Sequence, residues 1–222
     1  MHLDKIKDKI PQQLYEAVAA AGITELRPSQ EKSIKAGLLD GKSLLVCTPT
    51  ASGKTLIAEL AAVSAILNRQ GKAVYVVPLK ALAAEKFNEF KKRYGSFLRI
   101  ALSIGDFDSS DPYLADYDII ICTAEKLDSL VRHRAAWLRL IAVAIIDEVH
   151  LLNDPGRGPT LEILITLLKQ LLPNCQLIGL SATIGNPEEL AKWLGADVVM
   201  DNWRPVKLHQ GVYRDGVIRF KK

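Results

Sequence analysis

The sequence contains little cysteine and no long apolar run. Its three cysteines, Cys47, Cys122 and Cys175, lie far apart and form no C-x-x-C pair. We therefore expect reduced, buried thiols rather than a disulfide framework or a thiolate metal site. No segment approaches the roughly 18 apolar residues that a membrane span needs, and the first residues carry no apolar signal region. These absences predict a cytoplasmic protein that has no membrane partner.

The chain also lacks a strong excess of charge of one sign. Its 222 residues carry a net charge of +4, and 49% of them are hydrophobic and 24% charged. This composition is typical of a globular protein with one large α/β domain or two small ones. So small an excess permits nucleic-acid binding without predicting it. Basic residues do cluster at 86–99, 132–139 and 204–222, where solvated helix faces and a tail are the simplest interpretation.

Short apolar runs alternate with helical patterns along most of the chain. Strands are predicted at 43–47, 73–77, 99–103, 118–122, 142–146 and 177–180. Helices are predicted at 11–21, after Pro28, and at 56–67, 79–94, 124–133, 159–171 and 187–194. Alternation at this spacing predicts an α/β fold in which helices cover both faces of a mostly parallel sheet. The continuous apolar runs 119–121 and 141–146 are typical of strands buried on both faces.

The end of the chain has a different pattern. Asp215-Gly216 lies between two apolar segments, 206–213 and 217–220. An Asp-Gly pair in this position is a strong signal for a two-residue turn between antiparallel strands. The sequence therefore predicts a C-terminal β-hairpin.

The stretch TPTASGKT at 48–55 ends as a phosphate-binding loop does, but it lacks the leading glycine of G-x-x-x-x-G-K-[ST]. It lies between a predicted strand and a predicted helix, which is the context that the motif requires. The start of a helix offers backbone N–H groups and partial positive charge to a phosphate. Lys54 is expected to reach the β- and γ-phosphates, Thr55 to ligate Mg²⁺, and Gly53 to let the backbone approach closely. The alternative is a helix that merely begins with Gly-Lys-Thr.

Two other predicted strands also end in polar residues. Asp147 and Glu148 follow the strand at 142–146, and Ser181 and Thr183 follow the strand at 177–180. Ligands of open α/β sheets bind outside the carboxyl ends of the strands. We expect Asp147 to hold Mg²⁺ and Glu148 to accept a proton from the water that attacks the γ-phosphate. The alternatives are a solvated pair of acids and, for the two hydroxyl residues, a helix N-cap.

The segments TPTASGKT, DEVH at 147–150 and SAT at 181–183 resemble motifs I, II and III of superfamily 2 DExH-box helicases in order and spacing. Motif I of that family lacks the leading glycine, so Thr48 follows the family pattern. VVPLKALAAEK, CTAEKLDSL, DEVHLLNDPGRGPTLE and NWRPVKL are similar to its Ski-like branch and, within that branch, to archaeal Hjm-type DNA-repair helicases. The resemblance extends from Leu3 to Phe220 and implies a RecA-like P-loop NTPase domain.

The resemblance also implies roles for further residues. The segment 26–30 resembles the Q motif, whose glutamine reads the adenine edge. The residues implied to bind the nucleotide are Gln30, Thr50, Ala51, Ser52, Gly53, Lys54 and Thr55. Those implied to couple the phosphate site to the nucleic-acid groove are His150, Ser181 and Thr183. Those implied to contact the nucleic-acid backbone are Pro78, Leu79, Lys80, Gly105, Asp106, Thr123 and Lys126.

The family works with two RecA-like domains that bind ATP and Mg²⁺ between them. We therefore expect residues 1–202 to form the first domain and 203–222 to cross over toward a missing second domain. The expected activity is ATP-driven translocation on single-stranded or forked DNA and its unwinding. Because the second domain supplies arginines that complete the site, we expect the isolated chain to be weakly active or inactive.

Two other functions fit the same residues. One is an RNA helicase of the same branch, because contacts to the nucleic-acid backbone carry no sequence information and do not by themselves distinguish the substrates. The other is a non-catalytic nucleotide-binding module that docks a partner. Glu148 argues against the docking module, since a switch has less need of a catalytic base.

Overall fold

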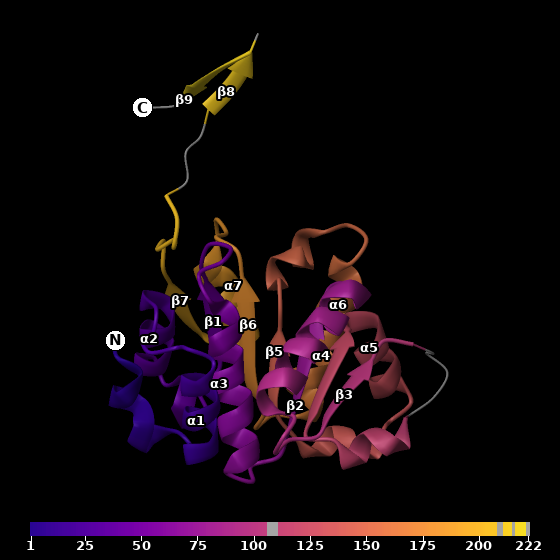
Figure 1. Cartoon of the computed structure of the whole chain (residues 1–222). Coiled ribbons are helices and arrows are strands. Elements are labelled where there is room, and N and C mark those ends of the chain that lie inside the picture. The colour runs from indigo at the N-terminus through magenta and orange to yellow at the C-terminus, as the bar shows by residue number, and fades with distance from the viewer. Residues whose placement is uncertain (106–110, 208–210, 215, 221–222) are drawn as a thin grey trace.

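The computed structural model describes residues 1–105, 111–207, 211–214 and 216–220. In these residues seven strands form one sheet with the order β3-β4-β2-β5-β6-β1-β7, and all neighbouring strands are parallel (Figure 1). The strands are β1 Leu44–Cys47, β2 Lys72–Val77, β3 Ile100–Ser103, β4 Ile119–Thr123, β5 Ile141–Ile146, β6 Gln176–Ser181 and β7 Asp197–Met200. The predicted parallel α/β sheet is confirmed.

Helices follow most of the strands, as the alternating pattern predicts. The α-helices are α1 Gln12–Ala20, α2 Pro28–Lys35, α3 Lys54–Leu67, α4 Lys80–Tyr94, α5 Ala124–Arg132, α6 Gly158–Leu171 and α7 Pro187–Leu194. Short 3-10 helices are η1 Leu3–Lys9, η2 Leu38–Asp40, η3 Pro112–Asp116, η4 Ala136–Leu140 and η5 Val149–Asn153. In this part of the chain no helix is both long and apolar enough to cross a membrane.

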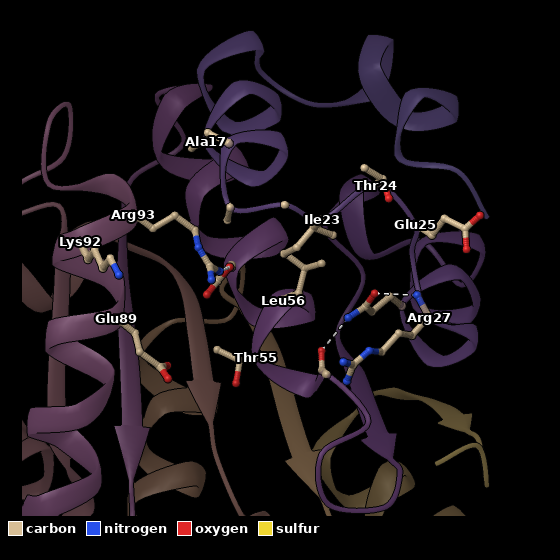
Figure 2. A pocket seen from close by; sticks show the side chains of 16 residues that line it. Ala17, Ile23, Thr24, Glu25, Arg27, Thr55, Leu56, Glu89, Lys92 and Arg93 are labelled. Atoms are coloured by element: carbon tan, nitrogen blue, oxygen red, sulfur yellow. Dashed lines mark hydrogen bonds and ion pairs between the residues drawn. The ribbon is translucent and has the colours of Figure 1, made fainter. Parts of the chain in front are cut away.

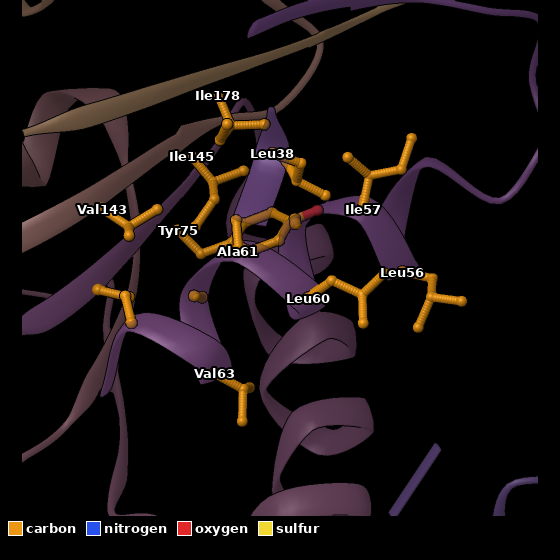
Figure 3. Close-up of a cluster of buried hydrophobic side chains, with 14 of the residues drawn as sticks. Leu38, Leu56, Ile57, Leu60, Ala61, Val63, Tyr75, Val143, Ile145 and Ile178 are labelled. Carbon is orange, nitrogen blue, oxygen red and sulfur yellow. The ribbon is translucent and has the colours of Figure 1, made fainter. Parts of the chain in front are cut away.

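The sheet separates two hydrophobic cores. Alternate residues of each strand point to opposite faces, so Tyr75 and Ile145 belong to one core, and Val76 and Ile146 belong to the other. Helices α1 to α4 pack on the first face and α5 to α7 on the second. Figure 3 shows the first core, where α3 side chains such as Leu60 lie against the sheet. Both faces are covered, which explains the continuous apolar runs in the central strands.

The sequence did not predict strand β7. It is an edge strand that pairs only with β1, and of its four residues only Val199 is buried. A strand this short and this exposed leaves no clear hydrophobic pattern to detect. Its place at the edge is fixed by pairing with β1, which periodicity cannot reveal.

The predicted C-terminal hairpin is present as β8 Gly211–Arg214 and β9 Val217–Phe220. Gly216 has a φ of 80°, as a tight hairpin turn requires. The first strand begins at Gly211, whereas the apolar segment in the sequence begins at Val206. Figure 1 shows the hairpin standing away from the parallel sheet, and every described residue of both strands is exposed.

Candidate nucleotide site at the carboxyl edge of the sheet

The three predicted phosphate-site segments leave neighbouring strands. In the strand order, β6 lies between β5 and β1. The loop 48–55 follows β1, the acid pair follows β5, and Ser181 ends β6. Carboxyl ends of parallel strands lie at one edge of the sheet, so the fold brings these segments together where ligands of such sheets bind.

The loop after β1 is held in a strained conformation. Ala51 and Gly53 have φ values of 64° and 93°, which lie in the left-handed region. The hydroxyl groups of Thr48 and Ser52 lie 2.7 Å apart and form a buried hydrogen bond across the loop. Helix α3 begins immediately afterwards at Lys54, so its first backbone N–H groups face the loop. This is the arrangement of backbone donors that binds a phosphate.

Lys54 connects the loop to the neighbouring strand. Its ammonium group donates to the carbonyl oxygens of Thr48, at 3.2 Å, and of Ser181, at 3.0 Å. The backbone N–H of Thr48 also donates to the Ser181 carbonyl, at 3.2 Å. The ammonium group has three N–H donors, so it can reach a phosphate oxygen while it holds this place between β1 and β6.

Asp147 and Glu148 lie one strand farther along the edge. One carboxylate oxygen of Asp147 accepts from the Tyr75 hydroxyl, at 2.9 Å, and the other from the Glu148 backbone N–H, at 2.9 Å. Glu148 has a φ of 52°, an uncommon conformation for a residue with a side chain and one that is found at functional sites. Both acids are half-buried.

His150 lies between the acid pair and the end of β6. Its Nδ1 is 3.2 Å from a Glu148 carboxylate oxygen and 3.4 Å from the backbone N–H nitrogen of Ala182. One nitrogen cannot donate to Glu148 and accept from Ala182 at the same time. Of the other two residues implied to couple the sites, Ser181 is fully buried and Thr183 is exposed.

A groove of about 930 Å³ adjoins the loop, which is large enough for a nucleotide-sized ligand. Its walls come from the α1–α2 connection, the start of α3 and the end of α4 (Figure 2). Gln30 lines it, and its amide is already engaged: Nε2 donates to the Gly53 carbonyl at 2.9 Å, and Oε1 accepts from the Arg27 backbone N–H at 2.8 Å. The amide nitrogen carries a second N–H, which is the donor that could read a base.

Two cations at this site were not identified from the sequence. The Arg27 guanidinium donates to the Ala51 carbonyl at 2.6 Å and lies over the Trp203 ring, 5.4 Å from its centroid. The Lys86 ammonium donates to the Thr55 hydroxyl, at 3.2 Å. Both residues lie within segments that resemble helicase motifs, but no spacing rule assigns them to the loop. Their contacts depend on how α2 and α4 pack beside α3.

An ion pair between a buried acid and a half-buried arginine lines the groove. Glu59 on α3 is 2% exposed at its side chain and pairs with Arg93. The Tyr94 hydroxyl donates to the same carboxylate, at 2.7 Å. Burial raises the pKa of Glu59, although Arg93 and Tyr94 act in the opposite direction. Burial likewise raises the pKa of Tyr94, and the charge of Glu59 adds to the shift. The cluster fixes α4 against α3.

The residues implied to contact nucleic acid differ in how exposed they are. Leu79, Lys80 and Gly105 are exposed, and each follows the carboxyl end of β2 or β3. Pro78 is half-buried beside them. Thr123 is buried, and its hydroxyl caps α5 by accepting from a backbone N–H, at 3.4 Å. Asp106 lies outside the described residues.

Lys126, which is also implied to contact nucleic acid, is buried. Its side chain is 2% exposed, and its ammonium group is 2.8 Å from an Asp111 carboxylate oxygen. This ion pair holds the lysine in the interior, and its contact with a nucleic-acid backbone stays a prediction. The partner residue is distant in sequence, and helix α5 alone gives no sign of the pairing.

The oxygen ligands at the edge fit Mg²⁺ better than a transition metal. Within the described ranges, no group of three or more His, Cys, Asp or Glu residues could hold a metal ion. Thr55 and Asp147 offer one hydroxyl and one carboxylate. Mg²⁺ is characteristically bound by one or two such protein oxygens, with substrate phosphates and water as its other ligands.

Comparison with known proteins agrees with this geometry. The sequence matches the DEAD/DEAH box helicase family over residues 27–190. The chain belongs to this family. The matched span of this DEAD/DEAH box chain contains the loop, the acid pair, Ser181 and Thr183.

Among relatives, the chain is 52% identical to the ATP-dependent DNA helicase Hel308 of Pyrococcus horikoshii over 210 residues, which is 95% of the chain and 29% of that protein. It is 54% identical to Hel308 of Methanocaldococcus jannaschii, over 90% of the chain and 17% of that protein. The structure matches the DUF1998 helicase MrfA bound to DNA, with a TM-score of 0.73 and 26% identity over 87% of the chain and 30% of MrfA. The chain thus spans less than a third of these proteins.

The strained loop gives a direct test of the site. A Cβ added at Gly53 would lie 2.5 Å from Gln30 Nε2, and the φ of 93° disfavours any side chain. We expect Gly53→Ala to lower the free energy of unfolding by about 1–3 kcal/mol and to weaken binding of ATP, as measured by urea unfolding and by fluorescence of a labelled nucleotide. Gly185, whose added Cβ would meet open space, is the control. If Gly53→Ala were as harmless as Gly185→Ala, the loop would not have this conformation.

Proposed function

We propose that this chain is the ATP-binding motor domain of an ATP-dependent DNA helicase of the Hel308 type. One observation carries the proposal: β1, β5 and β6 bring the loop lysine and the acid pair to one edge of the sheet, beside a nucleotide-sized groove. The names of the Hel308 relatives compared above support both ATP dependence and a DNA substrate.

The triphosphate of ATP binds on the loop 48–55, and the base enters the groove beside Gln30. Lys54 donates to the β- and γ-phosphate oxygens, as lysines in such loops do. Thr55 and Asp147 would hold Mg²⁺, which when bound offsets the negative charge of the phosphate oxygens. Glu148 orients water and accepts its proton. Residues 50–53 supply backbone N–H groups to the phosphates, and Gly53 lets the backbone approach them closely.

ATP hydrolysis is coupled to movement along the nucleic acid by three residues, His150, Ser181 and Thr183. His150 contacts Glu148 on one side and the Ala182 backbone on the other. Because its Nδ1 can satisfy only one of these partners at a time, a change at Glu148 alters the contact with the segment that follows β6. Thr183 in that segment is exposed and free to reach a nucleic-acid strand.

The exposed carboxyl ends of β2 and β3 bind single-stranded or forked DNA. Leu79, Lys80 and Gly105 supply the contact surface, with Pro78 and the buried Thr123 behind it. The start of α4 at Lys80 places helix N–H groups and an ammonium group together, which suits a backbone phosphate. An RNA substrate fits the same contacts, and competition between matched DNA and RNA oligomers distinguishes the two.

A second RecA-like domain completes the motor. The chain covers 29% of its Pyrococcus horikoshii relative, and the segment 203–222 ends in a hairpin whose described side chains are all exposed. We assign 1–202 to the first domain and 203–222 to the crossover. ATP hydrolysis then changes the closure of the two domains, which moves the chain along the DNA, and the isolated chain binds ATP with little turnover.

Substitution of Glu148, the proposed general base, distinguishes a motor domain from a nucleotide-binding docking module. In the protein that joins this chain to a second RecA-like domain, we expect Glu148→Gln to lower DNA-stimulated ATP hydrolysis about 100-fold or more. Binding of ATP should be unchanged, since the amide keeps the size of the side chain. Glu162→Gln, an exposed acid on α6, is the control. If the parent protein did not hydrolyse ATP, the docking module would be favoured. If Glu148→Gln hydrolysed ATP at the normal rate, Glu148 would not be the general base.

The DNA surface is tested through its salt dependence. If Lys80 neutralises one phosphate, Lys80→Ala should reduce the slope of log affinity against log salt concentration by about 0.7 for single-stranded DNA. Fluorescence anisotropy of a labelled oligomer measures the slope. Lys91→Ala, at an exposed position near the other end of α4, should leave it unchanged. Equal slopes for all three proteins would show that DNA does not contact the start of α4.

A further inference from the structure

The buried tyrosine Tyr75 touches the proposed metal-binding acid. It lies in β2 and is fully buried, and Figure 3 shows its ring within the first core. Its hydroxyl donates to Oδ2 of Asp147, at 2.9 Å. A tyrosine hydroxyl has an ordinary pKa of about 10, so at neutral pH it is a proton donor to this carboxylate.

Strand β2 fixes the position of Asp147 through two contacts. Besides the tyrosine hydroxyl, the Val76 carbonyl accepts from the Asp147 backbone N–H, at 2.8 Å. The remaining carboxylate oxygen, Oδ1, accepts from the Glu148 N–H, at 2.9 Å. Both side-chain oxygens thus have a donor, and the carboxylate cannot rotate without breaking at least one hydrogen bond.

The tyrosine ring is itself held rigidly. It packs edge-to-face on Phe90, with ring centroids 5.5 Å apart, and Phe90 packs in the same way on Tyr94, at 5.8 Å. The Tyr94 hydroxyl ends the stack on Glu59, at 2.7 Å. Three aromatic rings from β2 and α4 therefore keep the Tyr75 hydroxyl in place, as a support for a metal ligand must be.

We infer that Tyr75 is a positioning residue that holds the Asp147 carboxylate in the orientation that binds Mg²⁺, and so sets the Mg²⁺ requirement of nucleotide binding. The inference rests on the proposed nucleotide site. Groups that hydrogen-bond to a metal ligand orient it, and their loss typically costs 10–100-fold in metal affinity. A hydroxyl that only satisfied a buried polar group would contribute to stability and leave the Mg²⁺ requirement unchanged.

Tyr75→Phe removes the hydroxyl and keeps the ring. We expect it to raise, about 10-fold or more, the Mg²⁺ concentration that half-saturates binding of methylanthraniloyl-ATP to this chain. In EDTA, Tyr75→Phe and the parent chain should bind the nucleotide equally. Tyr15→Phe is the matched control, because it deletes another tyrosine hydroxyl that donates to an aspartate, Asp4, at 2.6 Å, and it lies outside the aromatic stack. It should leave the Mg²⁺ dependence as in the parent chain.

Asp147→Asn provides the second test. If Tyr75 acts through the carboxylate, adding Tyr75→Phe to Asp147→Asn should change the Mg²⁺ dependence no further. An unchanged half-saturating concentration in Tyr75→Phe, or an equal shift in Tyr15→Phe, would overturn the inference and leave the proposed function intact. Failure of the parent chain to bind the labelled ATP in Mg²⁺ would overturn both.

Discussion

The hydrogen bond from Lys54 to the Ser181 carbonyl is the contact on which the site depends. It joins the loop after β1 to the end of β6 across 127 residues of sequence, and β6 pairs directly with the strand that carries the acids. The bond forms because parallel strands present their carboxyl ends at one edge. If the strand order were different, every motif would still be present in the sequence, but Lys54 would lie away from Asp147 and Glu148.

The two hydrophobic cores make this edge rigid enough to hold strained groups. Ala51 and Glu148 keep positive φ values, which cost free energy in residues that carry a side chain and persist only where surrounding packing fixes them. Here that packing comes from helices on both faces of the sheet. The aromatic stack beneath Asp147 belongs to the first of these cores, so burial on one face of β2 determines the geometry of a polar group that follows β5.

Much of the fold could be predicted from the sequence because its central strands are buried on both faces and appear as continuous apolar runs. Strand β7 could not, since only Val199 is buried. Side-chain environments were harder to predict. Lys126 lies on an amphipathic helix that suggests a surface cation, yet Asp111, from another loop, pairs with it in the interior. Arg27 and Lys86 reach the loop only through tertiary packing, which local patterns do not encode.

Isothermal titration calorimetry with Mg²⁺ and a non-hydrolysable ATP analogue tests most directly whether the loop and the acids form one nucleotide site. We expect one-to-one binding to this chain, weakened at least about tenfold by Lys54→Ala, because a charge-assisted hydrogen bond contributes about 1.5–3 kcal/mol. No heat of binding by the parent chain, or equal affinity in the variant, would contradict it.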